Sequence, residues 1–186
     1  MKKALALAVL STTLATPVIA DELMDAVAKI APEVSSWLND PAVVDAVKAQ
    51  NAAHAGLSDS DIIDLDNQWR AETEGGAQPL IEKVMGNSLS AYLTDVKDAA
   101  GGKYTEIFVM DNRGLNVGQS DVTSDYWQGD EGKWQNTYLK GPRSVDVSEV
   151  ELDESTQTYQ SQLSLPVVSG GEVIGAVTVG VNVDML

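Results

Sequence analysis

The spacing of hydrophobic residues changes its period about half-way along the chain. From Leu23 to Leu38 the apolar residues recur every three or four positions, which predicts one long amphipathic helix. Asn39-Asp40-Pro41 interrupts this pattern, and the proline favours the first turn of a second helix. A short helix around residues 62–65 and a longer one over residues 79–96 follow. The first half of the chain is therefore predicted to be helical.

From Tyr104 onward the apolar residues alternate with polar ones or form short runs, which is typical of strands. This pattern predicts five strands, at residues 104–110, 115–119, 145–152, 158–168 and 172–183. A tight turn at Asp111–Gly114 joins the first two strands, and turns at 153–156 and 169–171 join the last three. The order of elements predicts an α+β domain, in which helices pack on a five-stranded antiparallel sheet.

The N-terminus has the pattern of a secretory signal peptide. Met1-Lys2-Lys3 supplies positive charge, and an apolar run from Ala4 to Leu14 follows. Val18-Ile19-Ala20 fits the usual cleavage pattern, which predicts a signal peptide over residues 1–20 and one mature domain over residues 21–186. The apolar run is too short to span a bilayer, so a periplasmic protein is expected.

The chain is strongly acidic and has no cysteine. It carries 28 acidic and 12 basic residues, a net charge of -16, which becomes -18 without the two lysines of the signal peptide. Nucleic-acid binding needs a basic face, so this charge argues against a nucleic-acid partner. The missing cysteines exclude disulfides and thiolate chemistry. A catalytic triad would have to use His54, the only histidine, and no nucleophile motif accompanies it. The sequence therefore predicts neither an enzyme nor a metal or cofactor site.

Four of the ten aromatic residues gather in the polar segment between the second and third strands. They are Tyr126, Trp127, Trp134 and Tyr138. Such side chains offer flat apolar walls with polar handles, as a small-molecule pocket requires. The alternative is that they close one end of the sheet, and for Tyr138 a core position is expected.

Three segments together resemble a known family. Residues 104–114, 124–131 and 173–181 resemble the extracytoplasmic Cache sensor domains, also called PDC sensors. The likeness covers nearly all of the mature chain and is greatest to stand-alone, single-Cache members, which are similar to chemotaxis-receptor ligand-binding domains. It implies a PAS-like sheet with a long N-terminal helix. It also implies a small-molecule pocket beneath the sheet, covered by the crossover after the second strand.

By this resemblance Tyr126, Trp127, Lys133 and Trp134 line the pocket, and Gln128 is a candidate amide donor. Lys133 is the cation expected to bind a carboxylate, since charge-assisted hydrogen bonds are the strong ones. The alternatives stay open: a solvated lysine paired with Asp130 or Glu131, and a helix-capping role for Gln128.

The resemblance also restricts the ligand. Family members hold amino acids, short carboxylates or amines, and amino-acid-binding double-Cache members have an aspartate in the last strand where this chain has Gly180. A small organic anion, a short carboxylate, is therefore the expected ligand. Arg70 suits a carboxylate by its bidentate geometry, but an ion pair with Asp66 or Glu72 is favoured for it.

Family receptors continue into a transmembrane helix and a signalling module, whereas this sequence ends at Leu186. A non-enzymatic, periplasmic binding domain that acts with a membrane-bound receptor is therefore expected. The alternative is a ligand-independent interaction or regulatory protein that docks on a membrane sensor. The apolar stripe of residues 23–38 is a candidate surface for a homodimer.

Overall fold

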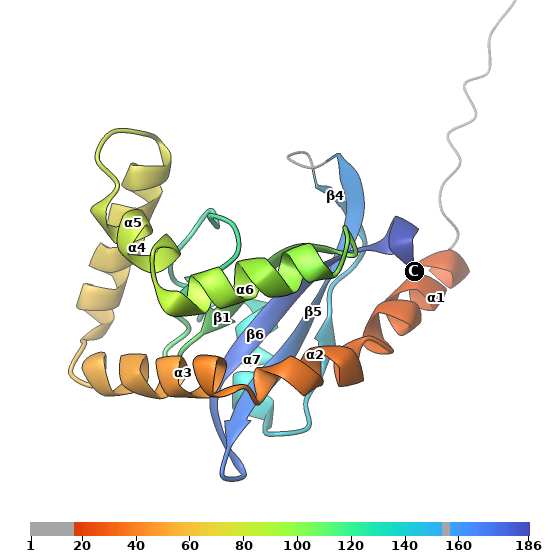
Figure 1. Cartoon of the computed structure of the whole chain (residues 1–186), viewed down its shortest axis with the longest axis horizontal. Helices are drawn as coiled ribbons and strands as arrows, with labels where there is room; N and C mark the ends of the chain where they lie inside the picture. The colour runs from red at the N-terminus through yellow and green to blue at the C-terminus, as the bar shows by residue number, and fades with distance from the viewer. Residues whose placement is uncertain (1–16, 154–156) are drawn as a thin grey trace, which may run out of the picture.

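One antiparallel sheet organises the chain, with the helices of residues 17–53 and 88–99 on one face and the short helix at residues 132–135 on the other (Figure 1). The computed structural model describes residues 17–153 and 157–186. The predicted signal peptide lies almost wholly outside these residues, as does most of the predicted turn at 153–156. The helices are α1 (Pro17–Ala28), α2 (Ala31–Leu38), α3 (Pro41–Ala53), α4 (Asp59–Thr73), α5 (Pro79–Met85), α6 (Ser88–Ala99) and α7 (Gly132–Gln135). The strands are β1 (Tyr104–Met110), β2 (Asn116–Gln119), β3 (Asp146–Val147), β4 (Glu151–Asp153), β5 (Thr158–Ser169) and β6 (Glu172–Asn182).

The strand order is β2-β1-β6-β5-β3, and all pairs are antiparallel. The strand expected at 145–152 is divided into β3 and β4, which pair with different parts of β5. The sheet is thus five positions wide, and the outer position is shared by two short strands. The predicted α+β class with an antiparallel sheet is confirmed.

The predicted helices exist, but two of them are interrupted. The helix expected over residues 23–38 ends at Ala28, and α2 begins with Pro32 in its first turn, where the missing N–H leaves no hydrogen bond unmade. The helix expected over residues 79–96 is divided near Gly86, and the Asn87 side chain accepts a hydrogen bond from the Ser90 N–H to start α6. The short helix around residues 62–65 is longer than expected, because a Ser58–Asp61 capping box starts α4 early.

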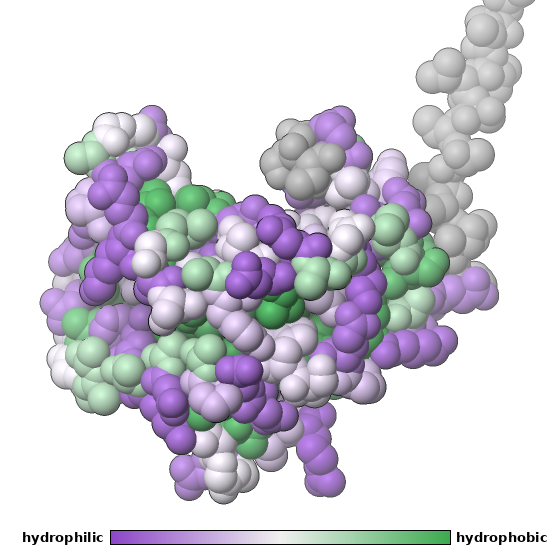
Figure 2. All heavy atoms as spheres, viewed as in Figure 1, coloured by the Kyte–Doolittle hydropathy of each residue, from purple (hydrophilic) through white to green (hydrophobic). Residues whose placement is uncertain are grey.

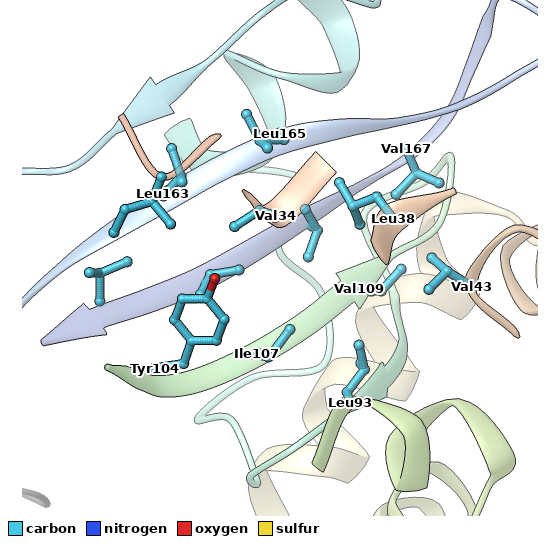
Figure 3. Packing of buried hydrophobic residues seen from close by; sticks show 14 of the residues in the cluster. Val34, Leu38, Val43, Leu93, Tyr104, Ile107, Val109, Leu163, Leu165 and Val167 are labelled. Atoms are coloured by element: carbon cyan, nitrogen blue, oxygen red, sulfur yellow. The ribbon is translucent and has the colours of Figure 1, made fainter. Parts of the chain in front are cut away.

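The main core lies between the sheet and four helices, α1, α2, α3 and α6 (Figure 3). The apolar stripe of the first two helices is buried there, through Val27, Ile30, Val34 and Leu38. These four residues are covered by the sheet, and a homodimer through the N-terminal helices stays a prediction. Hydrophilic residues are spread over the outer sides of the helices (Figure 2). A second, smaller cluster joins α4 and α5 to Leu115 and Tyr126.

Candidate ligand-binding site

The sheet face away from these helices carries polar side chains in cross-strand rows. In one row Glu106 of β1, Gly180 of β6 and Gln162 of β5 lie side by side. In the next polar row Phe108, Thr178 and Ser164 are neighbours, and the Ser164 and Thr178 hydroxyls are 2.9 Å apart. Strand alternation explains the arrangement, because every second side chain of each strand points to this face.

Two cavities lie over these rows, beneath the segment that contains α7. One has a volume of about 390 Å³ and is lined by Glu131, Gly132, Lys133, Asp146, Ser148, Glu151, Gln160, Gln162 and Ser164. The other, of about 400 Å³, is lined by Glu106, Phe108, Val122, Thr123, Ser124, Gln128, Lys133, Asp153 and Gln162. Lys133 and Gln162 belong to both linings, so the cavities adjoin at these two side chains. Their volumes fall within the usual range of small-molecule sites.

Lys133 is placed where a cation was predicted. Its Nζ forms an ion pair with Glu131 Oε2 at 2.9 Å and donates a hydrogen bond to Gln128 Oε1 at 3.3 Å. The same Nζ lies 5.4 Å from the centroid of the Phe108 ring. The lysine side chain is only 16% exposed, so the charge is partly desolvated. Lys133 thus lines both cavities and pairs with Glu131, and its role in binding a carboxylate stays a prediction.

Gln128 and Trp134, two further residues of the predicted site, have different surroundings. Gln128 is buried, lines the cavity that also contains Glu106, and donates from Nε2 to the Asp125 carbonyl at 3.0 Å. Trp134 packs on Phe108 under the sheet, and its Nε1–H donates to the Asp111 carbonyl at 3.1 Å. Trp134 lies outside the residues that line the two cavities, and its role as a direct ligand contact stays a prediction.

Tyr126 and Trp127 fix the crossover to α4 and to the β1–β2 turn. The Tyr126 ring stacks on Trp69 with centroids 5.4 Å apart, and Trp127 Nε1 donates to the Arg113 carbonyl at 2.8 Å. The backbone N–H groups of both residues donate to Asp66 Oδ1, at 2.9 and 3.0 Å. The structure therefore separates these two residues from the cavities that Lys133 and Gln128 line, and their role as direct ligand contacts stays a prediction.

Arg70 and His54, the two other polar side chains considered from the sequence, both pair with aspartates. Arg70 Nε pairs with Asp66 Oδ2 at 2.8 Å, one of the two partners expected from the sequence. His54 Nδ1 lies 3.0 Å from Asp111 Oδ2 and thereby joins α3 to the β1–β2 turn. Within the described residues, no group of three or more histidine or acidic side chains is placed to hold a metal ion.

Sequence reasoning missed Glu106. Burial raises the pKa of this carboxyl, and Gln162 Nε2 donates to its Oε1 at 2.9 Å. The bond crosses the central strand above Gly180, where a Cβ would clash most closely with Thr105 Oγ1 and would lie 2.8 Å from Glu106 Cγ. Glycine is therefore needed for side chains of β1 and β5 to meet across β6. Alternation in β1, which places Glu106 and Phe108 opposite Ile107, was the signal available in the sequence.

Comparison with known proteins gives the fold. No family model matches the chain, and no curated protein matches it in sequence. Among solved structures, the sensor domain of Escherichia coli DcuS is 14% identical with a TM-score of 0.50, over 89% of this chain and 95% of that domain. The chain has the PAS-like fold of the Cache (PDC) sensor domains.

Two longer sensor domains are also similar, at lower scores. The ligand-binding domain of the Campylobacter jejuni chemoreceptor Tlp3, in complex with 4-methylisoleucine, is 13% identical, with a TM-score of 0.39 over 89% of this chain. The sensor domain of the Vibrio cholerae histidine kinase DctB is 15% identical, with a TM-score of 0.38 over 88% of this chain. The chain spans 57% of the length of each. Each helix in residues 17–153 and 157–186 is too short or too polar to cross a membrane.

Proposed function

We propose that this chain is a periplasmic, non-catalytic binding domain that holds a short organic carboxylate on the polar face of its sheet. The observation that carries the proposal is the pair of adjoining cavities that share Lys133, the cation predicted from the sequence. A desolvated ammonium group is the natural partner for a carboxylate, and the Gln128 and Gln162 amides add hydrogen-bonding groups.

The proposed role is signalling without catalysis. We propose that a membrane-bound receptor is the partner and that a ligand in the cavity changes the receptor's activity. The ligand would contact α7 and β5 at once, because Lys133 lies on the helix and Gln162 on the strand. Ligand binding would thereby fix the crossover on the sheet.

The test is a thermal-shift screen of short carboxylates and amino acids on protein freed of bound ligand. A true ligand at 100 times its Kd should add about 2.7 kcal/mol to the free energy of unfolding. For each compound that raises the melting temperature, Lys133→Gln should weaken binding by about tenfold or more. If every compound leaves the melting temperature unchanged, the proposed function is wrong.

Lys103→Gln is the matched control. Lys103 also pairs with a glutamate, Glu33, at 2.6 Å, but it lies away from both cavities. Its substitution should leave the Kd unchanged within about twofold. Equal losses in the two variants would assign the effect to net charge instead of to the site.

One observation favours the alternative, an interaction protein that docks on a membrane sensor. Leu152 and Tyr159 are direct cross-strand partners in β4 and β5, and they are 47% and 54% exposed. Exposed apolar pairs at a sheet edge are typical of contact surfaces. Substituting both by serine should abolish receptor binding if this alternative holds, and should leave ligand affinity unchanged if the cavity alone acts.

A further inference from the structure

A single turn of α4, residues 66–70, contacts the part of the crossover that forms one wall of a cavity. We call this part, residues 122–128, the wall segment. It contributes four side chains to the lining that contains Glu106: Val122, Thr123, Ser124 and Gln128. Residues 66–70 themselves lie outside both cavity linings. The helix turn can therefore act on a ligand only through the position of the wall segment.

Asp66 makes the central contacts of this turn. It is only 7% exposed, and its Oδ1 accepts hydrogen bonds from two backbone N–H groups, those of Tyr126 at 2.9 Å and Trp127 at 3.0 Å. Its Oδ2 accepts a third hydrogen bond from Arg70 Nε at 2.8 Å. Hydrogen bonds to an ionised carboxylate are roughly twice as strong as those between neutral groups. Asp66 therefore fixes two consecutive backbone positions of the wall segment, immediately before Gln128.

Trp69 and Arg70 hold the wall segment on either side of these bonds. Trp69 Nε1 donates to the Thr123 carbonyl at 2.8 Å, and its ring stacks on that of Tyr126. Arg70 Nη2 pairs with Asp125 Oδ2 at 2.9 Å. Because one helix turn makes all these contacts, the wall segment can leave the cavity only by breaking them together or by taking α4 with it.

A second buried acid of α4, Glu72, holds a different element. It is 5% exposed, and its Oε2 accepts from the backbone N–H groups of Leu80 and Ile81, both at 2.9 Å, in the first turn of α5. Its other side-chain partner is Gln68 of the same helix. Helix α4 thus contains an internal comparison, since one buried carboxylate holds the cavity wall and the other holds α5.

We propose that Asp66 is a positioning residue of the binding site, which keeps the wall segment closed over the cavity without touching the ligand. The inference rests on the proposed function and adds the regulation of the same site. The ligand binds the closed form, so its apparent Kd rises as the closed fraction falls. By the reciprocity of linkage, a bound ligand also strengthens the hold of α4 on the wall segment.

Amide hydrogen exchange of the full chain, followed by NMR without added ligand, tests the contact itself. Asp66→Asn removes the charge and should speed exchange of the Tyr126 and Trp127 amides by about tenfold to hundredfold. Glu72→Gln is the matched control, and should speed exchange at Leu80 and Ile81 while leaving the two wall amides unchanged. Should Asp66→Asn fail to fold, Arg70→Gln replaces it, since the Arg70 side chain is 52% exposed.

Binding separates positioning from a general structural role. The probes are acetate, lactate, pyruvate and the common amino acids, and each compound that raises the melting temperature is titrated by calorimetry. Asp66→Asn should weaken its binding by about tenfold, and Asp66→Glu, which keeps the charge, should recover part of the loss. Glu72→Gln should bind within about twofold of the parent. A bound probe should also slow exchange of the Tyr126 and Trp127 amides in the parent protein.

The outcomes distinguish this inference from the proposed function. If a probe binds the parent and Asp66→Asn equally tightly, the inference is wrong and the proposed function stands. If Asp66→Asn and Glu72→Gln lose equal affinity, or speed exchange of the wall amides equally, the effect is a general loss of stability and the inference is overturned. If no probe raises the melting temperature, the proposed function is wrong and the binding role of Asp66 falls with it.

Discussion

Adjacent rows of the same three strands behave in opposite ways. Ile107, Val179 and Leu163 form one cross-strand row, fully buried under the helices. The adjacent residues of these strands, Glu106, Gly180 and Gln162, form a row that faces the cavities. The first row is packed apolar surface, whereas the second leaves space and keeps a half-buried acid.

The difference separates stability from binding within one sheet. Apolar burial under four helices supplies the free energy of folding, which is roughly proportional to the apolar area removed from water. The polar face contributes less, because each hydrogen bond there adds only about 1 kcal/mol after the cost of losing water. A polar face that is costly to maintain is therefore expected where a ligand supplies the missing partners.

The largest expected effect is a loss of stability on the helix-covered face. Leu163→Ala removes a fully buried side chain and should lower the free energy of unfolding by about 2–5 kcal/mol. Gln162→Ala, one residue away, should cost about 1 kcal/mol, because it loses one hydrogen bond to Glu106. Urea denaturation measures both, and equal losses would contradict the division between the two faces.

The next effect concerns the space above the central strand. Gly180→Ala places a methyl group against Thr105 Oγ1, with Glu106 Cγ as the next contact. It should therefore cost about 1–3 kcal/mol and disturb the side-chain hydrogen bonds that cross β6, the Gln162–Glu106 bond among them. Gly56→Ala is the control, since a Cβ there meets nothing within 4 Å and its φ is ordinary. The same denaturation experiment compares them. An unchanged Gly180→Ala variant would show that the row does not depend on a missing side chain.

The smallest effect is a pH-dependent gain of stability. The folded pKa of Glu106 is raised by burial, so the acid favours folding when protonated and loses that contribution as the pH rises through its folded pKa. Glu106→Gln should therefore be at least as stable as the parent at pH 7. The difference should disappear as the pH falls below the ordinary value of 4.5. Thermal melts from pH 4 to pH 8 measure this, and a variant that is less stable at every pH would contradict it.

Local signals predicted the fold well. The apolar run at residues 104–110 and the turn after it gave β1 with its observed bounds, because strand and turn preferences are local. The division of the first long helix was missed although Pro32 marks it. Continuous apolar spacing through residue 38 concealed the break, and only the backbone shows that α2 starts anew.

The site was predictable only where its residues act locally. Lys133 and Gln128 lie in the predicted segment and line a cavity. Tyr126 instead packs on Trp69, which is far earlier in the sequence, and no local pattern distinguishes an aromatic cavity wall from an aromatic core residue. Glu106 needed the strand register, because its partner Gln162 lies two strands away.

Side-chain signals of the two faces offer the most direct test of the account. In a protein NMR titration with the first compound that raises the melting temperature, the side-chain amides of Gln128 and Gln162 report the cavities, and the methyl groups of Val177 and Val179 report the helix-covered face. A ligand site on the polar face predicts saturable shifts of the two amide signals, with the valine methyl signals nearly unchanged. Unchanged amides together with large shifts of the valine methyls, or of the Tyr126 and Trp127 ring signals alone, would contradict a ligand site on the polar face.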